Sequence, residues 1–112
     1  MGDDEMSERE FVAVAKLEDV PPGAKKLVEV GGVELILCNT KDRIFACRNL
    51  CSHAYEKLDG GRMKAGWIAC PVHGARFDLE TGQPMNPPAV MPIDVFAVRV
   101  DGDTITVAAP AA

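Results

Sequence analysis

The only two histidines of the chain each follow a cysteine at short range, in the stretch CSHAYEKLDGGRMKAGWIACPVHG. One residue separates Cys51 from His53, two residues separate Cys70 from His73, and sixteen residues lie between the pairs. A cysteine thiolate is a soft metal ligand and a neutral imidazole is a borderline one. Two of each can bind either a zinc ion or an iron–sulfur centre, provided that the two short loops meet.

The order of the ligands separates these possibilities in part. Zinc fingers usually have a pair of cysteines followed by a pair of histidines, whereas each pair here has one of each. If each of two irons takes the same residue type from both loops, two cysteines bind one iron and two histidines the other. A structural zinc site with the same four ligands stays as the alternative. A catalytic Cys-His dyad has less support, because both loops offer the same pair and no third residue orients it.

Short segments rich in valine, isoleucine and phenylalanine recur between turn signals, which is the pattern of an all-β fold. We predict strands in FVAVAKL (11–17), KKLVEV (25–30), VELILCN (33–39), RIFACRN (43–49), DVFAVRV (94–100) and DTITVAA (103–109). Gly31-Gly32, Lys41-Asp42 and Asp101-Gly102-Asp103 are placed to make hairpin turns. A meander or a small barrel follows, and no segment has convincing helical periodicity.

Alternation is clearest near the carboxyl end of the chain. We expect one continuous strand there, with Val95, Ala97 and Arg99 on one side and Phe96, Val98 and Val100 on the other. The segment 51–92 between the predicted strands is richer in glycine and proline. Loops carried on a rigid scaffold are where functional residues concentrate.

Length and composition predict a single domain over residues 1–112. No apolar run approaches the ~18 residues that cross a bilayer. The N-terminal segment MGDDEMSERE is acidic where a secretory signal would be basic. We therefore expect a cytoplasmic monomer with a mobile tail over about residues 1–8. The net charge of −5 argues against nucleic acid and anionic membranes as partners.

The remaining cysteines and aromatic residues have structural interpretations. Cys38 and Cys47 lie in predicted strands, and we expect each to be a small buried apolar side chain rather than half of a disulfide, which a reducing compartment disfavours. Trp67 and Phe77 flank the second Cys-His pair, and we expect them to pack beneath the loops and exclude water. Tyr55 follows His53 closely and is a candidate for contact with partner proteins.

The two Cys-His pairs resemble the Rieske motif, C-x-H followed by C-x-x-H. The segments ACRNLCSHAYEKLDGGRM, WIACPVHGARFDLETGQPMNPPAV and DVFAVRVDGDTITV resemble the Rieske-type ferredoxins of bacterial aromatic-ring dioxygenase systems, from about Phe11 onwards. The resemblance implies an antiparallel β sandwich or open barrel with a smaller cluster-binding subdomain at about residues 47–82.

The resemblance also implies a site. One 2Fe-2S cluster would be bound by Cys51 and Cys70 on the inner iron and by His53 and His73 on the outer iron. A proline-rich loop, Gln83 to Val90, would cover it. Neutral imidazoles in place of two thiolates make an added electron more favourable. Rieske centres accordingly have potentials of roughly −150 to +300 mV, against about −400 mV for plant-type ferredoxins.

A protein of this kind is a one-electron carrier rather than an enzyme. Its partners would be an NAD(P)H-dependent flavoprotein reductase and a terminal aromatic-ring-hydroxylating oxygenase. An oxygenase subunit itself needs a mononuclear iron bound by two histidines and a carboxylate, and both histidines here are already assigned. The alternatives are a small Rieske-like subunit of an assimilatory nitrite reductase and a structural zinc module that binds other proteins.

Four positions differ from the pattern of high-potential respiratory Rieske proteins. Glu56 and Val72 stand where that pattern has the cysteines of a disulfide, Ala75 replaces a serine, and Phe77 replaces a tyrosine. Hydroxyl groups that donate to sulfur stabilise the reduced cluster, so their loss lowers the potential. We therefore predict a potential at the low end of the Rieske range.

Overall fold

The computed structural model describes residues 10–52, 56–72, 74–86 and 91–108, and these ranges form strands with a single 3-10 turn, η1 (Leu17–Asp19). The strands are β1 (Phe11–Lys16), β2 (Lys25–Val30), β3 (Val33–Thr40), β4 (Arg43–Arg48), β5 (Met63–Lys64), β6 (Trp67–Ala69), β7 (Arg76–Asp78), β8 (Val95–Phe96), β9 (Val98–Asp101) and β10 (Thr104–Ala108). The all-β prediction is confirmed. The tail predicted over residues 1–8 lies outside the described residues.

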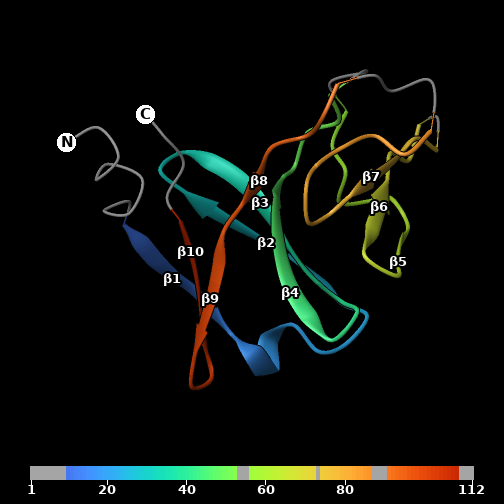
Figure 1. The fold of residues 1–112 in the computed structure, drawn as a ribbon. Coiled ribbons are helices and arrows are strands. Elements are labelled where there is room, and N and C mark those ends of the chain that lie inside the picture. Colours follow the sequence, from blue (N-terminus) through green and yellow to red (C-terminus); the bar gives the residue numbers. More distant parts are fainter. Residues whose placement is uncertain (1–9, 53–55, 73, 87–90, 109–112) are drawn as a thin grey trace.

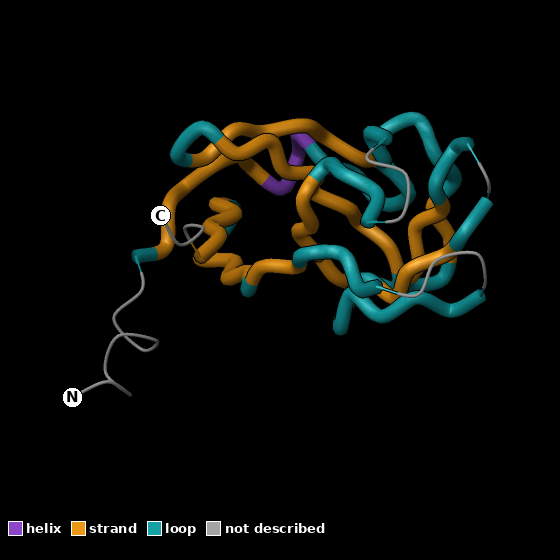
Figure 2. Tube along the Cα trace, turned by 90° about the horizontal axis from the view of Figure 1, so that it is seen from above, coloured by secondary structure: helices purple, strands orange, loops and turns teal. Residues whose placement is uncertain are grey.

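Three antiparallel sheets make up the fold. Their strand orders are β1-β10-β9, β2-β3-β4-β8 and β5-β6-β7. In Figure 1 the small β5-β6-β7 sheet lies at the opposite end of the molecule from β1, β9 and β10, with β3 and β4 between them. Figure 2 shows that the long loops gather at the end that holds this small sheet.

The predicted hairpin turns are present. Gly31 and Gly32 join β2 to β3 with φ values of 58° and 82°, and Lys41 and Asp42 join β3 to β4 with 56° and 58°. Two successive residues with positive φ match the right-handed twist of the strands that they connect. Glycine adopts this conformation without strain, whereas Lys41 and Asp42 adopt it at a cost that the paired strands on either side offset.

The continuous strand expected over residues 95–100 was wrong, because the chain changes sheets in the middle of it. β8 ends at Phe96 and pairs with β4, whereas β9 begins at Val98 and pairs with β10. Ala97 between them is exposed, and its carbonyl accepts a hydrogen bond from the amide of Ala108 at 2.9 Å. A strand that switches sheets forms a corner of a sandwich. Past this corner Val100 is 43% exposed, so its side chain does not join the core.

Strands β3 and β4 are buried on both faces, because a separate core packs against each. The core shared with the β1-β10-β9 sheet consists of Val20, Val30, Leu35, Leu37, Ala46, Ile105 and Val107. The core shared with the small sheet and its loops contains Ile36, Cys38, Phe45, Cys47, Cys51, Leu58, Ile68, Cys70, Ala75, Phe77, Leu79 and Ile93. Alternate residues of a strand point to opposite faces, so one pair of strands supports both layers.

In the described part of the chain, no helix has the length and apolar character needed to span a membrane.

Gly61 allows a close approach between the loop before β5 and the end of β6. A Cβ atom at this position would overlap the backbone carbonyl of Ala69, whereas one at Gly60 would meet nothing within 4 Å. We predict that Gly61→Ala destabilises the protein by about 1 to 3 kcal/mol, the usual cost of overpacking, and lowers Tm by roughly 5 to 15 °C. Gly60→Ala is the control and should leave Tm nearly unchanged in thermal circular dichroism. Equal Tm values for the two variants would contradict the close approach.

Candidate metal centre

The first Cys-His loop begins directly after β4. Cys51 is fully buried, and its backbone amide donates to the carbonyl of Glu56 at 2.6 Å, which closes the loop on itself. The hydroxyl of Ser52 donates to the carbonyl of Met91, also at 2.6 Å. This loop is therefore tied both to its own far end and to the segment that leads into β8. His53 and Tyr55, which the sequence assigned to a ligand role and a partner contact, lie outside the described residues.

Asn49 anchors this loop to the central sheet, and sequence reasoning missed it. Its side-chain oxygen accepts from the amides of Leu58 (2.7 Å) and Asp59 (2.9 Å). Its side-chain nitrogen donates to carboxylate oxygens of Glu34 (3.0 Å) and Asp59 (3.1 Å). Asn49 is the one buried polar or charged residue among those described, and it makes four hydrogen bonds with its amide group. The sequence signal was an asparagine directly after a strand, which we took only as the end of that strand.

An exposed ion pair supports the same loop from outside. The Lys57 ammonium lies 2.9 Å from a Glu34 carboxylate oxygen. This hydrogen bond holds the pKa of the Glu34 carboxyl below its ordinary value and raises the pKa of the Lys57 ammonium. Because the pKa of the Glu34 carboxyl is lowered, its contribution to stability is present above the ordinary value of 4.5 and is lost as the pH falls into the acid range. Because the pKa of the Lys57 ammonium is raised, its contribution to stability is lost only when the pH rises above the ordinary value of 10.5. Both groups are therefore charged throughout the neutral range.

The second loop follows β6. Cys70 is buried, its amide donates to the carbonyl of Ala75, and its carbonyl accepts from the amide of Gly74, each at 2.8 Å. Gly74 has a φ of 74°, which lets the chain reverse direction within this tight loop. His73, the second predicted histidine ligand, lies outside the described residues.

The two loops converge on one buried cluster of side chains. Cys51 and Cys70 belong to it together with Leu58, Ile68, Ala75 and Phe77, all almost fully buried. The structure thus places both predicted cysteine ligands in the same apolar environment, although eighteen residues separate them in the chain. The expectation that Phe77 packs beneath the loops is confirmed.

The residues of this cluster fit a thiolate-bound metal centre. No disulfide joins any of the four cysteines, all of which lie in the described part of the chain. The buried thiols on the two loops are soft metal ligands. The apolar side chains around them exclude water from a metal bound there. The donor set suits an iron–sulfur centre or zinc, as the sequence alone also indicated.

Trp67 differs from the expectation of a buried aromatic residue. It is half-buried in β6, and the Arg76 guanidinium lies over its ring at 4.8 Å from the centroid. Trp67 and Arg76 line a hollow of about 310 Å³ together with Gly60, Gly61, Arg62, Ala69, Cys70, Pro71 and Gly74. One face of the indole is therefore covered by a cation rather than by the core, at the edge of the second loop.

The start of the predicted covering loop is attached to β7. The amide of Met85 donates to the carbonyl of Arg76, and the amide of Arg76 donates to the side-chain oxygen of Asn86, both at 2.8 Å. Pro84 forms an isolated bridge with Phe77. Residues 83–86 therefore run beside β7, the strand that follows the second Cys-His loop, and residues 87–90 lie outside the described part.

Cys38 and Cys47 are both fully buried in the same core, which confirms the expectation that they act as small apolar side chains. The hydrogen bond with the Cys38 thiol, together with burial, raises the pKa of the Cys47 thiol well above its ordinary value. A raised pKa favours the protonated thiol, which is a poor ligand and a poor nucleophile.

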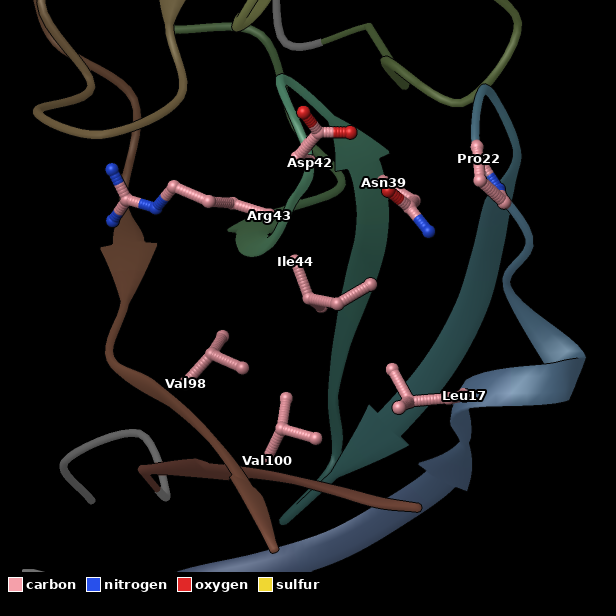
Figure 3. A pocket seen from close by; sticks show the side chains of 8 residues that line it. All are labelled: Leu17, Pro22, Asn39, Asp42, Arg43, Ile44, Val98 and Val100. Carbon is pink, nitrogen blue, oxygen red and sulfur yellow. The ribbon is translucent and has the colours of Figure 1, made fainter. Parts of the chain in front are cut away.

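A second hollow, of about 490 Å³, lies away from both Cys-His loops and includes neither of their cysteines. In Figure 3 Leu17, Ile44, Val98 and Val100 face into it, and Asp42 and Arg43 stand at its border. It opens between the two larger sheets where β4 and β9 diverge. Its lining has no group of nucleophilic or metal-binding side chains.

Comparison with known proteins identifies the class. The family model described as Rieske [2Fe-2S] domain matches residues 10–97, so this chain belongs to the Rieske [2Fe-2S] family. The family match decides between the two centres that the donor set allowed, and the cofactor is a 2Fe-2S cluster of the Rieske type.

Within the family the chain is similar to ferredoxins. It is 33% identical over 102 residues to the ferredoxin component of the naphthalene 1,2-dioxygenase system of Pseudomonas aeruginosa, which covers 91% of this chain and 97% of the relative. It also matches the ferredoxin of carbazole 1,9a-dioxygenase from Nocardioides aromaticivorans IC177, with a TM-score of 0.84, 40% identity, and coverage of 89% of this chain and 98% of that one.

A third match is a structure of reduced oxygenase and oxidized ferredoxin in complex, from carbazole 1,9a-dioxygenase. The TM-score is 0.82 at 29% identity, with 94% of this chain and 100% of the matched chain covered. These relatives are electron-transfer components and not catalytic enzymes. This chain is accordingly a one-electron carrier of the Rieske ferredoxin type.

The amide group of Asn49 makes four hydrogen bonds and holds Leu58 and Asp59 by their backbone. We predict that Asn49→Ala lowers the free energy of unfolding by about 2 to 4 kcal/mol, because buried amides lose their acceptor. The loss corresponds to a fall in Tm of roughly 10 to 20 °C. The control is Asn39→Ala, which removes a single side-chain hydrogen bond to the carbonyl of Val20 and should cost about 1 kcal/mol. Similar losses in thermal unfolding of the two variants would refute the anchoring role.

Proposed function

We propose that Cys51, His53, Cys70 and His73 bind the 2Fe-2S cluster, and that the chain carries single electrons from a flavoprotein ferredoxin reductase to a terminal ring-hydroxylating oxygenase. The observation that carries this proposal is the burial of Cys51 and Cys70 in one apolar cluster at the ends of the two predicted ligand loops. Its support from comparison is the match along nearly the whole length of ferredoxin components of dioxygenase systems.

The burial of Cys51 and Cys70 supports the division of labour between the four ligands that the resemblance implies. When bound, the cluster supplies the capacity to take up and release one electron. The thiols of Cys51 and Cys70 would hold the inner iron, and the imidazoles of His53 and His73 the outer iron. Leu58, Ile68 and Phe77 enclose the thiols and keep water away from the sulfur atoms. We also propose that residues of about 47–82 form the cluster-binding subdomain of a single-domain, monomeric, cytoplasmic protein.

The surroundings of the two thiols support a potential at the low end of the Rieske range. Ala75 and Phe77 are both fully buried in the cluster that contains Cys51 and Cys70. Neither has the hydroxyl that the respiratory Rieske pattern has at its position. A reduced centre here would lack the stabilisation that such donors give to its added negative charge. A low potential suits a carrier that accepts electrons from a flavin and passes them to an oxygenase.

Three exposed apolar residues belong to segments that adjoin the two Cys-His loops. Val72, Met85 and Met91 are 50%, 53% and 60% exposed, and they are three of the five large apolar residues that the described part of the chain exposes. Val72 lies in the second ligand loop, and Ser52 of the first loop donates to the carbonyl of Met91. Exposed methionine and valine side chains allow brief contacts with differently shaped partners. We propose that both partners dock over these three residues, which we call the tip patch.

Electron delivery tests the proposed function. We predict that the purified protein restores product formation when it is added to a dioxygenase system from which the ferredoxin was omitted. Val72→Asp should lower the second-order rate of electron transfer to the oxygenase at least several-fold, because a charge in the tip patch must be desolvated on docking. Val100→Asp is the control, since Val100 is similarly exposed but lies in β9. Failure of the wild-type protein to support turnover in systems of the related classes would overturn the proposal.

The ligand set is tested by spectroscopy and potential. We predict a Rieske-type electron paramagnetic resonance signal and a midpoint potential near the low end of the family range, independent of pH near neutrality. His53→Cys should either abolish the cluster or lower its potential, because a thiolate adds negative charge. Cys47→Ala, which changes a buried cysteine outside the ligand set, should keep the wild-type spectrum. An unchanged spectrum in His53→Cys would exclude His53 as a ligand.

A further inference from the structure

Lys25 extends from the edge of the central sheet toward the loops of the metal centre. It is the first residue of β2 and pairs with Cys38 of β3. Directly paired residues in antiparallel strands have their side chains on the same face, and the Cys38 side chain belongs to the core that contains Cys51 and Cys70. Lys25 is therefore on the face of the sheet that supports the metal centre.

The ammonium group of Lys25 is bound by backbone carbonyls. Its Nζ donates to the carbonyl oxygen of Asp59 at 2.8 Å and to the carbonyl oxygen of Gly61. The side chain is partly buried, and in the described part of the chain no carboxylate forms an ion pair with it. The nearby Asp59 carboxylate instead accepts from the Asn49 amide. The positive charge of Lys25 is thus held by dipoles and is only partly screened by solvent.

The turn that Lys25 holds is in close contact with the second ligand loop. Gly61 approaches the carbonyl of Ala69 so closely that a Cβ atom would overlap it. Ala69 is the residue before Cys70, and Gly61 and Cys70 line the same hollow. The charge also acts on one buried thiol of this core, because Lys25 acts to lower the pKa of Cys47 against the larger effects of the Cys38 hydrogen bond and burial.

We propose that Lys25 is a positioning residue of the metal centre, which clamps the turn at residues 59–61 against the end of β6 and raises the reduction potential of the centre. A positive charge in a partly buried position favours the state with one more electron. The clamp keeps that charge at a constant distance from the inner ligands. Lys25 thereby opposes the effect of the missing hydroxyls at Ala75 and Phe77.

The test compares midpoint potentials of Lys25→Met, Lys25→Arg and Lys26→Met, each measured on protein with a Rieske-type resonance signal. Lys26 is exposed and neighbours Lys25 in the chain, so Lys26→Met removes the same charge from a position in solvent. We expect a shift to more negative potential in Lys25→Met, a potential close to wild type in Lys25→Arg, and little change in Lys26→Met. Equal potentials in Lys25→Met and wild type, or equal shifts in Lys25→Met and Lys26→Met, would overturn the proposal.

If Lys25→Met does not assemble a cluster, a second variant, Lys25→Gln, tests the effect of the charge. Lys25→Gln can still donate to a carbonyl of the turn but has no charge, so a lower potential supports the electrostatic effect and a wild-type potential overturns it. If Lys25→Arg assembles a cluster while Lys25→Met and Lys25→Gln do not, the requirement for a cation at this clamp is supported. If Lys25→Arg also fails, the proposal is wrong. The inference rests on the proposed ligand set, which fails separately if wild-type protein itself gives no Rieske-type signal.

Discussion

The metal centre depends on the hydrogen bonds of one buried amide. Asn49 uses its oxygen to fix two backbone amides of the loop that follows Cys51, and its nitrogen to bind Glu34 and Asp59. An aspartate in its place would have no donors, and a leucine would leave the amide of Leu58 buried without an acceptor. Because the held turn contacts Ala69, the position of the second loop depends on this amide as well.

The architecture supplies rigidity by burying β3 and β4 on both faces. Side chains on one face of these strands pack against the β1-β10-β9 sheet, and those on the other face pack beneath the two Cys-His loops. Cys38 and Cys47 belong to the second set as buried thiols. A displacement of β3 or β4 would disturb both cores. The strands beneath the metal centre therefore cannot move without disrupting the packing on their other face.

The strands of the two larger sheets, the hairpin turns and the two cysteines that meet in one buried cluster could be predicted because each has a local signal: alternation, residues suited to positive φ, or a short Cys-His spacing. The sheet switch at Ala97 could not, since alternation continues through 95–100 while the hydrogen-bond partners change from β4 to β10. Asn49 and Lys25 were missed for a similar reason. Their partners lie nine to thirty-six residues away in the chain, and nothing in their immediate sequence distinguishes them from a strand end or a solvated lysine.

The reduction potential of such a carrier has to lie between those of its donor and its acceptor, so two opposing influences on it are informative. Ala75 and Phe77 carry no hydroxyl at positions where the respiratory Rieske pattern has one, which makes the reduced state less favourable. The Lys25 charge, which is bound to the turn at residues 59–61, acts in the other direction. Hydroxyl donors act directly on the sulfur atoms, whereas the Lys25 cation acts through space from the turn at residues 59–61. Replacement of Lys25 by an uncharged residue that still donates to this turn, such as glutamine, is therefore a route by which this fold could adjust its potential while the clamp on the turn is kept.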